Sequence, residues 1–116
     1  MRKSILKDRS YAFAIEIVKL SKRLQEEKKE FVLSKQILRS GTAIGALIRE
    51  AEFGQSKPDF IHKMSVGLKE ANETDFWLSL LKDTNYLAQD KYLELFKDCN
   101  EIISMLVATI KTLKSK

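Results

Sequence analysis

The feature that most constrains the fold of this chain is an apolar stripe that repeats, without interruption, at alternating steps of four and three residues. Its seven members are Tyr92, Phe96, Cys99, Ile103, Leu106, Ile110 and Leu113. Because an α-helix turns once in about 3.6 residues, such steps place every member on one helix face. A helix with one apolar face must bury it against other elements. The stripe therefore predicts a long helix, opening at Gln89, that packs against further helices.

Three earlier segments repeat this periodicity. The first runs roughly from residue 9 to residue 27, and its core stripe consists of Phe13, Ile17, Leu20 and Leu24. We expect the apolar face of this helix to be widened by Tyr11, Ala14, Ile15 and Val18. Either Asp8 or Ser10 is the expected N-cap, because both side chains can accept a hydrogen bond from a free backbone N–H.

The second and third segments are separated by a break at Gly54. The second begins at Ser34, and its core stripe is Ile37, Gly41, Ile44, Ile48 and Ala51. The third is expected to start with Ser56 as N-cap and Pro58 in its first turn, where the missing N–H of proline costs nothing. It extends as far as Tyr86, and its core stripe is Phe60, Met64, Gly67, Ala71, Thr74, Leu78 and Leu81.

Composition supports a helical fold and excludes several classes of site. A length of 116 residues predicts one domain spanning residues 1–116. Four glycines and one proline are too few for the many turns of a β-sandwich or barrel. One cysteine and one histidine exclude a disulfide framework within the chain and most metal or catalytic constellations. We predict an all-α protein, an antiparallel up-down-up-down four-helix bundle.

The net charge of +5 is concentrated at the two ends of the chain. Residues 1–9 carry +3, residues 111–116 carry another +3, and the residues between them carry −1. In an up-down bundle both termini and the connection between the second and third helices lie at one end, which we call the basic pole. Its candidate nucleic-acid-binding residues are Arg2, Lys3, Lys7, Arg9, Lys57, Lys111, Lys114 and Lys116.

Such a cluster is compatible with binding a polyanion, and also with a role in solubility alone. The sequence does not suggest aromatic stacking at this pole. Binding is therefore expected to depend on phosphate contacts and to be weakly sequence-specific.

A second apolar surface lies off the core stripe of the third helix. Phe76 and Leu80 fall about 160–200° around the helix from Leu78, and Trp77 falls about 100° from it. Contiguous exposed aromatic surface usually marks an interface. We predict a homo-oligomer interface formed by Val66, Lys69, Glu73, Phe76, Trp77 and Leu80. The alternative is that Trp77 only covers the edge of the core.

Three glycines lie inside predicted helices, where each costs about 1 kcal/mol relative to alanine. They are Gly41, Gly45 and Gly67. We expect this cost to be offset by a close approach of the second and third helices, backbone against backbone.

The sequence offers little for catalysis or cofactor binding. His62 follows Asp59 at the spacing used in di-metal bundles, but such sites need this element twice, so His62 is expected to be solvated. Cys99 lies in a core stripe and is expected to be a small buried hydrophobe. We predict no enzymatic activity, no cofactor and no metal site. Without an apolar signal core or membrane span, a cytoplasmic location is expected.

Long runs of the sequence carry a family resemblance. They are residues 38–45 (LRSGTAIG), 49–51, 55–57, 59–61, 63–65, 68–71, 73–74, 77–78 and 80–81, with Tyr11, Phe13, Ala14 and the stripe of the fourth helix. Together they resemble the four-helix-bundle proteins associated with 23S ribosomal RNA intervening sequences. Departures from the usual family pattern occur at Ala43, Ala46 and Gly67, where Ser, Asn and Ala are more common.

The resemblance implies an up-down bundle, assembly into ring-shaped homopentamers, an RNA-related role in bacteria and no enzymatic activity. A distant branch of this family assists a reverse transcriptase and binds nucleic acid as a basic pentameric barrel. The leading hypothesis is therefore a non-catalytic homo-oligomer that binds RNA or another nucleic acid. The alternative is a scaffold that docks a partner protein without touching nucleic acid.

Overall fold

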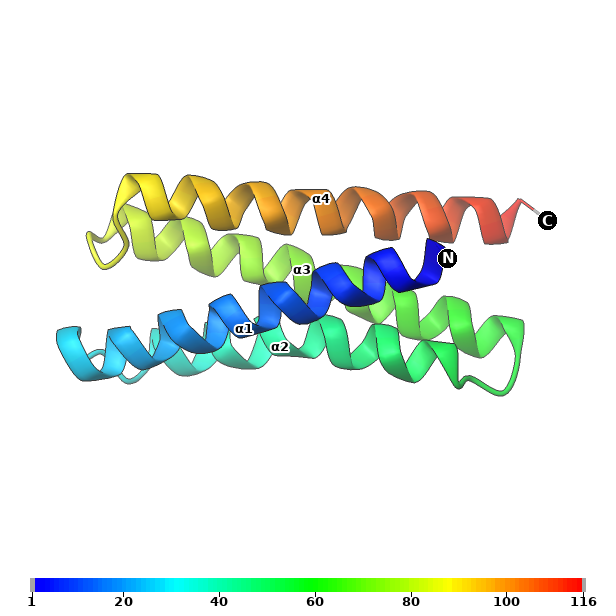
Figure 1. The fold of residues 1–116 in the computed structure, drawn as a ribbon, viewed down its shortest axis with the longest axis horizontal. Helices are drawn as coiled ribbons and strands as arrows, with labels where there is room; N and C mark the ends of the chain where they lie inside the picture. Colours follow the sequence, from blue (N-terminus) through cyan, green and yellow to red (C-terminus); the bar gives the residue numbers. More distant parts are fainter. Residues whose placement is uncertain (1, 116) are drawn as a thin grey trace.

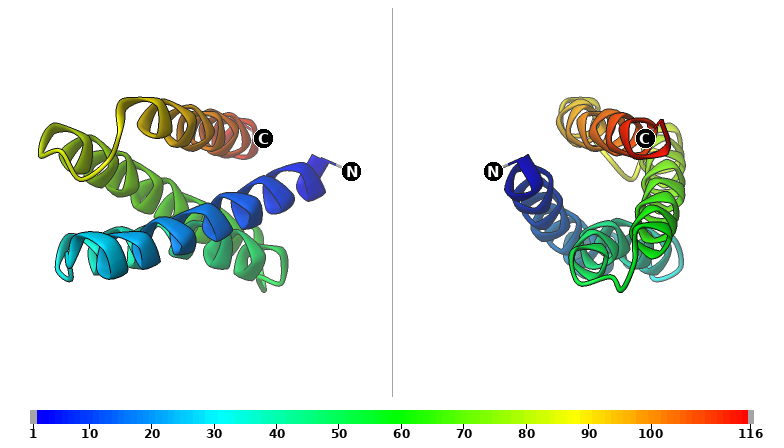
Figure 2. Two further views of the ribbon diagram at one scale, coloured as in Figure 1. Left: turned by 60° about the vertical axis from the view of Figure 1, so that its left-hand side comes forward. Right: turned by 90° about the vertical axis from the view of Figure 1, so that its right-hand side faces the viewer.

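Four helices make up the structure, a computed structural model that describes the backbone of residues 2–115 and the side chains of residues 5–115. They are α1 (Arg2–Lys28), α2 (Leu33–Glu52), α3 (Lys57–Asp83) and α4 (Gln89–Lys114). Each helix packs against the next in an up-down bundle that measures 47 × 21 × 21 Å (Figure 1). The end-on view in Figure 2 shows the four helices arranged around one axis. The predicted four-helix bundle is confirmed.

The start of α1, the end of α4 and the α2–α3 connection lie at the same end of the bundle (Figure 1). The other two connections lie at the opposite end. The topology therefore brings the start of α1, the end of α4 and the α2–α3 connection to one pole, as the sequence predicts, because an even number of antiparallel helices returns the chain to the end where it started. None of the four helices, over the residues described, is long and apolar enough to cross a membrane.

Helix starts agree with the sequence for α3 and α4 but not for α1. The Ser56 hydroxyl accepts a hydrogen bond from the Asp59 N–H at 3.2 Å, which confirms the predicted cap of α3. Helix α1 begins at Arg2, so the prediction that Asp8 or Ser10 caps it is wrong. Ser10 lies inside the helix, and its hydroxyl donates to the Lys7 carbonyl at 3.0 Å.

Two connections contain a helix cap and a left-handed residue that the sequence patterns did not predict. The Glu30 carboxylate accepts hydrogen bonds from the N–H groups of Leu33 (3.0 Å) and Ser34 (2.7 Å), and so satisfies the free donors at the start of α2. Helix α3 ends at Asp83 rather than at Tyr86. Asn85 has a φ of 68°, in the left-handed region that turns a chain out of a helix.

The core follows the predicted stripes of α1, α2 and α3 closely. Phe13, Ile17, Leu20 and Leu24 are all buried, and so is every member of the α2 stripe. In α4 the prediction is only partly right: Tyr92, Cys99, Leu106 and Ile110 are buried, but Phe96, Ile103 and Leu113 are half-buried. Leu95 and Ile102 are buried instead, so the buried face of α4 is turned from the predicted stripe toward these two residues.

The expected wide apolar face of α1 is wrong for its three large members. Tyr11, Ile15 and Val18 are exposed by 59%, 41% and 40%. They fall about 140–200° around the helix from Phe13, so they point away from the bundle axis. These side chains form a separate apolar strip on the outer surface of α1.

The glycines of α2 allow a close approach to α1, not to α3 as expected. A Cβ on Gly41 would lie 2.8 Å from Ile17 Cγ2, and a Cβ on Gly45 would lie 3.4 Å from the Ser10 carbonyl oxygen. Gly67 does face α2, but a Cβ there would lie 3.8 Å from Leu47, which is ordinary van der Waals distance. The two α2 glycines therefore face α1, and Gly67 is the one of the three that lies between α2 and α3.

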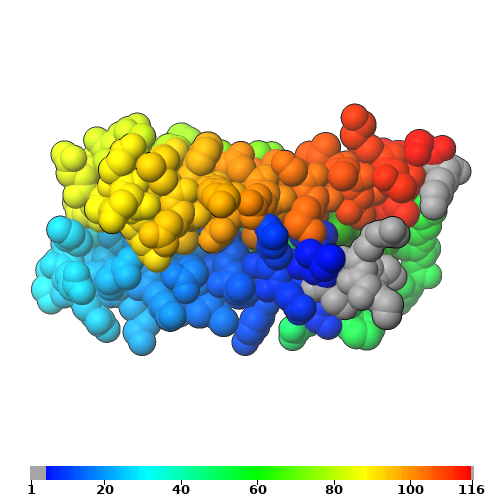
Figure 3. Space-filling view, turned by 45° about the horizontal axis from the view of Figure 1, so that its top comes forward, coloured from blue at the N-terminus to red at the C-terminus, as the bar shows by residue number. Residues whose placement is uncertain are grey.

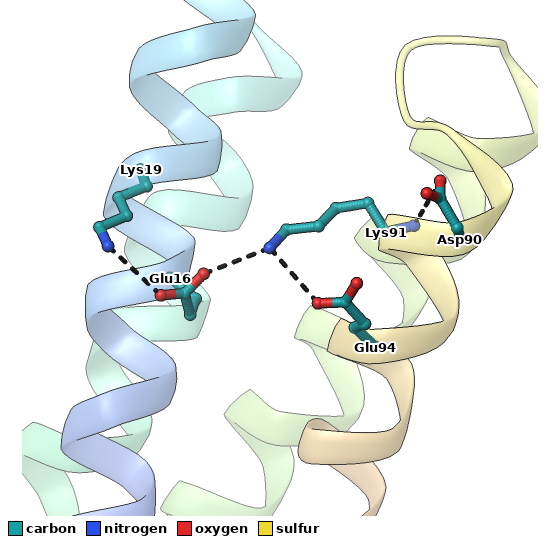
Figure 4. Close-up of polar contacts among 5 residues, drawn as sticks. All are labelled: Glu16, Lys19, Asp90, Lys91 and Glu94. Carbon is teal, nitrogen blue, oxygen red and sulfur yellow. Dashed lines mark hydrogen bonds and ion pairs between the residues drawn. The ribbon is translucent and has the colours of Figure 1, made fainter.

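The seam between α1 and α4 is the least extensive contact between neighbouring helices. Figure 3 shows α4 lying along α1 with their side chains meeting at this seam. The Lys91 ammonium bridges it, 3.3 Å from the Glu16 carboxylate and 3.7 Å from that of Glu94 (Figure 4). The hydrogen bond from Lys91 holds the pKa of Glu16 below its usual value, with Lys19 adding to the effect and partial burial opposing it.

Candidate nucleic-acid interface

Three described lysines form the exposed part of the basic pole. Lys57 occupies the first turn of α3, and Lys111 and Lys114 lie in the last turn of α4. Lys57 and Lys114 line one shallow hollow, of about 560 Å³, together with His62. The packing of α3 against α4 thus brings together cations that are 57 residues apart in the sequence.

These three lysines are free to meet an external anion. All three are exposed, and none has an ion pair within residues 5–115. Lysines near the C-terminal end of α4 are also favoured there by the helix dipole. Neutralising phosphates with such side chains releases counterions, which is the main source of sequence-independent affinity for nucleic acid.

Two other predicted cations, Lys7 and Arg9, are placed differently. Lys7 lies 3.9 Å from the Glu52 carboxylate. Arg9 pairs with Glu101 of α4 and lines a groove along the α1–α4 seam that also holds Asp8, Glu16 and Asp98. Arg9 therefore sits among carboxylates rather than with the lysines of the pole. The side chains of Arg2, Lys3 and Lys116 lie outside those that the structure describes.

Aromatic side chains, which the sequence patterns did not place at this pole, border it. Lys7 lines a hollow between α1 and α2 with Tyr11 and Phe53. Phe53 is 79% exposed, immediately after the end of α2. The available sequence signal for this surface was an aromatic residue directly before Gly54, at the predicted break between the second and third helices.

The predicted oligomer flank of α3 exposes mainly Phe76, whose side chain is 58% exposed. Trp77 is partly buried against the core, its Nε1 donates to Glu73 at 3.3 Å, and its ring meets that of Phe76 edge-on at 5.0 Å. Lys69 is exposed, and the other two predicted members, Val66 and Leu80, are half-buried. The arrangement combines a core-edge role for Trp77 with an exposed ring beside it.

The single histidine lies apart from the core of the bundle, at its surface. His62 is exposed, and the Asp59 carboxylate accepts a hydrogen bond from the Gln55 N–H at 3.3 Å. Within residues 5–115 no group of three or more His, Cys, Asp or Glu side chains could hold a metal ion.

Cys99 is buried and its Sγ lies 3.3 Å from the Ala71 carbonyl oxygen. Burial, with the nearby carboxylates of Asp75 and Asp98, raises the pKa of this thiol to about 12. The sulfur therefore stays protonated at neutral pH, which removes the thiolate that a nucleophile or ligand needs.

Comparison with known proteins agrees with this architecture. A protein of unknown function from the S23 ribosomal protein family of Bacteroides thetaiotaomicron is 53% identical, and its crystal structure superposes with a TM-score of 0.94. The alignment covers 96% of this chain and 99% of that one. No curated protein matches the chain. The profile described as 23S rRNA-intervening sequence protein matches residues 2–108, nearly the whole length, and the chain therefore belongs to the 23S rRNA-intervening sequence protein family.

Proposed function

We propose that this protein is a non-catalytic homo-oligomer that binds RNA through its basic pole. The observation that carries the proposal is the convergence of Lys57, Lys111 and Lys114 at one end of the bundle, exposed and without ion pairs among the described residues. The family description, which refers to intervening sequences of 23S rRNA, supports RNA as the polyanion. At the opposite pole Lys28 is accompanied by Glu26 and Glu27, so the charge there nearly cancels.

Oligomerisation would bring several copies of this weak binding site together in one particle. One pole offers few phosphate contacts, but a ring of identical subunits presents several poles to one strand, and linked contacts raise the overall affinity strongly. Exposed Phe76 on α3 is the surface that we assign to contact between copies. Five copies of the 13.4 kDa chain, the number implied by the family resemblance, would weigh about 67 kDa.

Absence of catalysis is part of the proposal. The only histidine is exposed and the only thiol is buried and protonated, so an acid–base or nucleophilic constellation has no obvious starting residue. Binding, rather than turnover, is the role supported by a bundle whose net charge of +5 is concentrated at the ends of the chain.

The test is a titration of labelled RNA at low and moderate salt, with the wild type and Lys111→Ala/Lys114→Ala. We expect weaker binding by the variant and a smaller dependence of affinity on salt. The logarithmic slope should fall by about 0.7–0.9 for each phosphate that the variant no longer neutralises.

The matched control is Lys28→Ala/Lys35→Ala, which removes two exposed lysines from the opposite pole. Equal affinities for the two variants would contradict a role for the basic pole. A protein partner that stays bound after nuclease treatment, with no RNA binding at low salt, would favour the scaffold alternative instead.

A further inference from the structure

A hollow of about 710 Å³ lies beside the basic pole on the outer surface of α1 and α2. Its sides include Tyr11, Arg49 and Phe53, and its lining includes three small residues, Ala14, Gly45 and Ala46. Small side chains allow a flat group to come close to the two helix backbones, which are themselves closely packed at Gly45.

The two aromatic rings of this hollow are unusually exposed. Phe53 is 79% and Tyr11 59% exposed. The Phe53 backbone is held in place, because its N–H donates to the Glu50 carbonyl at 3.1 Å, so the exposed ring projects from a fixed helix end. Both rings line the same hollow and so present flat apolar faces to one partner. A planar partner could stack on either ring.

The charge of the hollow favours an anionic partner, because its lining holds three cations against one carboxylate, that of Glu50. Arg49 lies 5.9 Å from the centre of the Tyr11 ring, and within residues 5–115 it has no ion pair. Lys7 and Lys63 also line the hollow, with single contacts to Glu52 at 3.9 Å and to Glu50 at 3.5 Å. Surface pairs of this kind are worth little, so the ammonium groups can turn to a phosphate at small cost.

We propose that this hollow binds an unpaired base of single-stranded RNA. The base stacks on Tyr11 or Phe53, and the flanking phosphates contact Arg49 and the two lysines. Bases of a duplex are already stacked and cannot enter, whereas splayed bases of single strands are recognised by aromatic side chains and arginine planes. The inference rests on the proposed RNA-binding function and adds the class of RNA that is bound.

The experiment measures the affinity of three labelled probes: a single strand of about 12 nucleotides, an abasic strand of the same length and a duplex. The test variant is Tyr11→Ala/Phe53→Ala. We expect it to bind the single strand about tenfold more weakly, because stacking is worth about 1–3 kcal/mol per base. Its affinity for the abasic strand and the slope of affinity against salt should not change, since no cation is removed. The single variant Phe53→Tyr keeps both rings, so it should bind the single strand much more tightly than the test variant does.

The matched control is Phe31→Ala, which removes a ring that is 49% exposed at the opposite pole. Circular dichroism and light scattering on each variant verify fold and assembly. Wild-type affinity in the test variant, with weakened binding by Lys111→Ala/Lys114→Ala, would overturn the stacking site and leave the proposed function intact. Absence of RNA binding by the wild type would overturn both. Loss of assembly without loss of RNA affinity would show that the hollow is an interface between copies, which also overturns the inference.

Discussion

The Lys91 ammonium of α4 lies 3.3 Å from the Glu16 carboxylate of α1, and this pair bridges the seam where neighbouring helices touch least. The first and last helices of the bundle have no loop between them, so only side chains join them along their length. A second pair, between Arg9 and Glu101, crosses the same seam. Each such exposed pair contributes little energy by itself.

The first prediction is that Lys91→Met lowers the free energy of unfolding by about 0.5 kcal/mol at neutral pH. The pKa of Glu16 is lowered in the folded state, so the contribution is present above the pKa of the unfolded chain and is lost as pH falls through the lower folded value. Urea denaturation of wild type and variant across acidic pH should show the difference disappear. Glu94→Gln is the control, because Glu94 is 68% exposed and contacts the same lysine only at 3.7 Å; an equal loss in that variant would contradict the assignment to Glu16.

The second prediction concerns two glycines with opposite surroundings. Gly41→Ala should destabilise the bundle by about 1–3 kcal/mol, because the new methyl would lie 2.8 Å from Ile17 and must push α1 away. Gly67→Ala should stabilise it by about 0.5–1 kcal/mol, because the new methyl would make only an ordinary van der Waals contact with Leu47 and alanine favours the helix. Thermal denaturation followed by circular dichroism measures both. A gain in stability from both substitutions would show that α1 and α2 are not packed this closely.

The third prediction is that Asp75→Asn stabilises the protein at neutral pH by about 1 kcal/mol. Asp75 Oδ1 is buried without a hydrogen-bond partner in the described part of the chain. Burial raises the pKa of this carboxyl, while the side chain of Asn100 lowers it in part. The pKa of Asp75 is higher in the folded state than in the unfolded state, so stability is lost as pH rises from the unfolded pKa through the folded pKa. The neutral amide of asparagine does not ionise and therefore avoids this loss of stability.

Chemical denaturation of Asp75→Asn at acidic and neutral pH checks this expectation, with the exposed Asp8→Asn as control. The gain from the Asp75 substitution should shrink in acid. A gain that is constant across pH would rule out the carboxylate charge as its cause.

The fourth prediction separates assembly from folding on the outer flank of α3. Trp77 is one of the six residues that the sequence predicts at the interface between copies, but its indole is partly buried against the core, so Trp77→Ala should lower both the assembled mass and the melting temperature. Phe76→Ala removes a ring that is 58% exposed and should reduce assembly with little change in helical signal. Light scattering over a range of protein concentrations, together with circular dichroism, distinguishes the two effects. An unchanged mass for Phe76→Ala would exclude this flank as the interface between copies.

Local patterns in the sequence were enough to predict the four helices and most of their buried faces. The steps of four and three residues identify which side of a helix is apolar, and Ser56 marks the start of α3 through chemistry that involves only its own neighbours along the chain. The position of the basic pole follows from the number of helices and their antiparallel order. The apolar faces and the Ser56 cap depend on spacing along the chain, and the pole depends on the number of helices. None of these results requires knowledge of how one helix is rotated against another.

Which side chains of different helices touch one another was not predictable from the sequence and is shown only by the tertiary structure. Gly41 meets Ile17 of α1, although its spacing in α2 fits a contact with α3 equally well. Arg9 faces Glu101 of α4 across 92 positions of sequence, which takes it away from the lysines of the pole. Tyr11 and Phe53 come together with Arg49 in one hollow because α1 and α2 are packed closely at Gly45. Helical periodicity fixes the angle between side chains on one helix, but the direction in which that helix faces is set by the packing of all four.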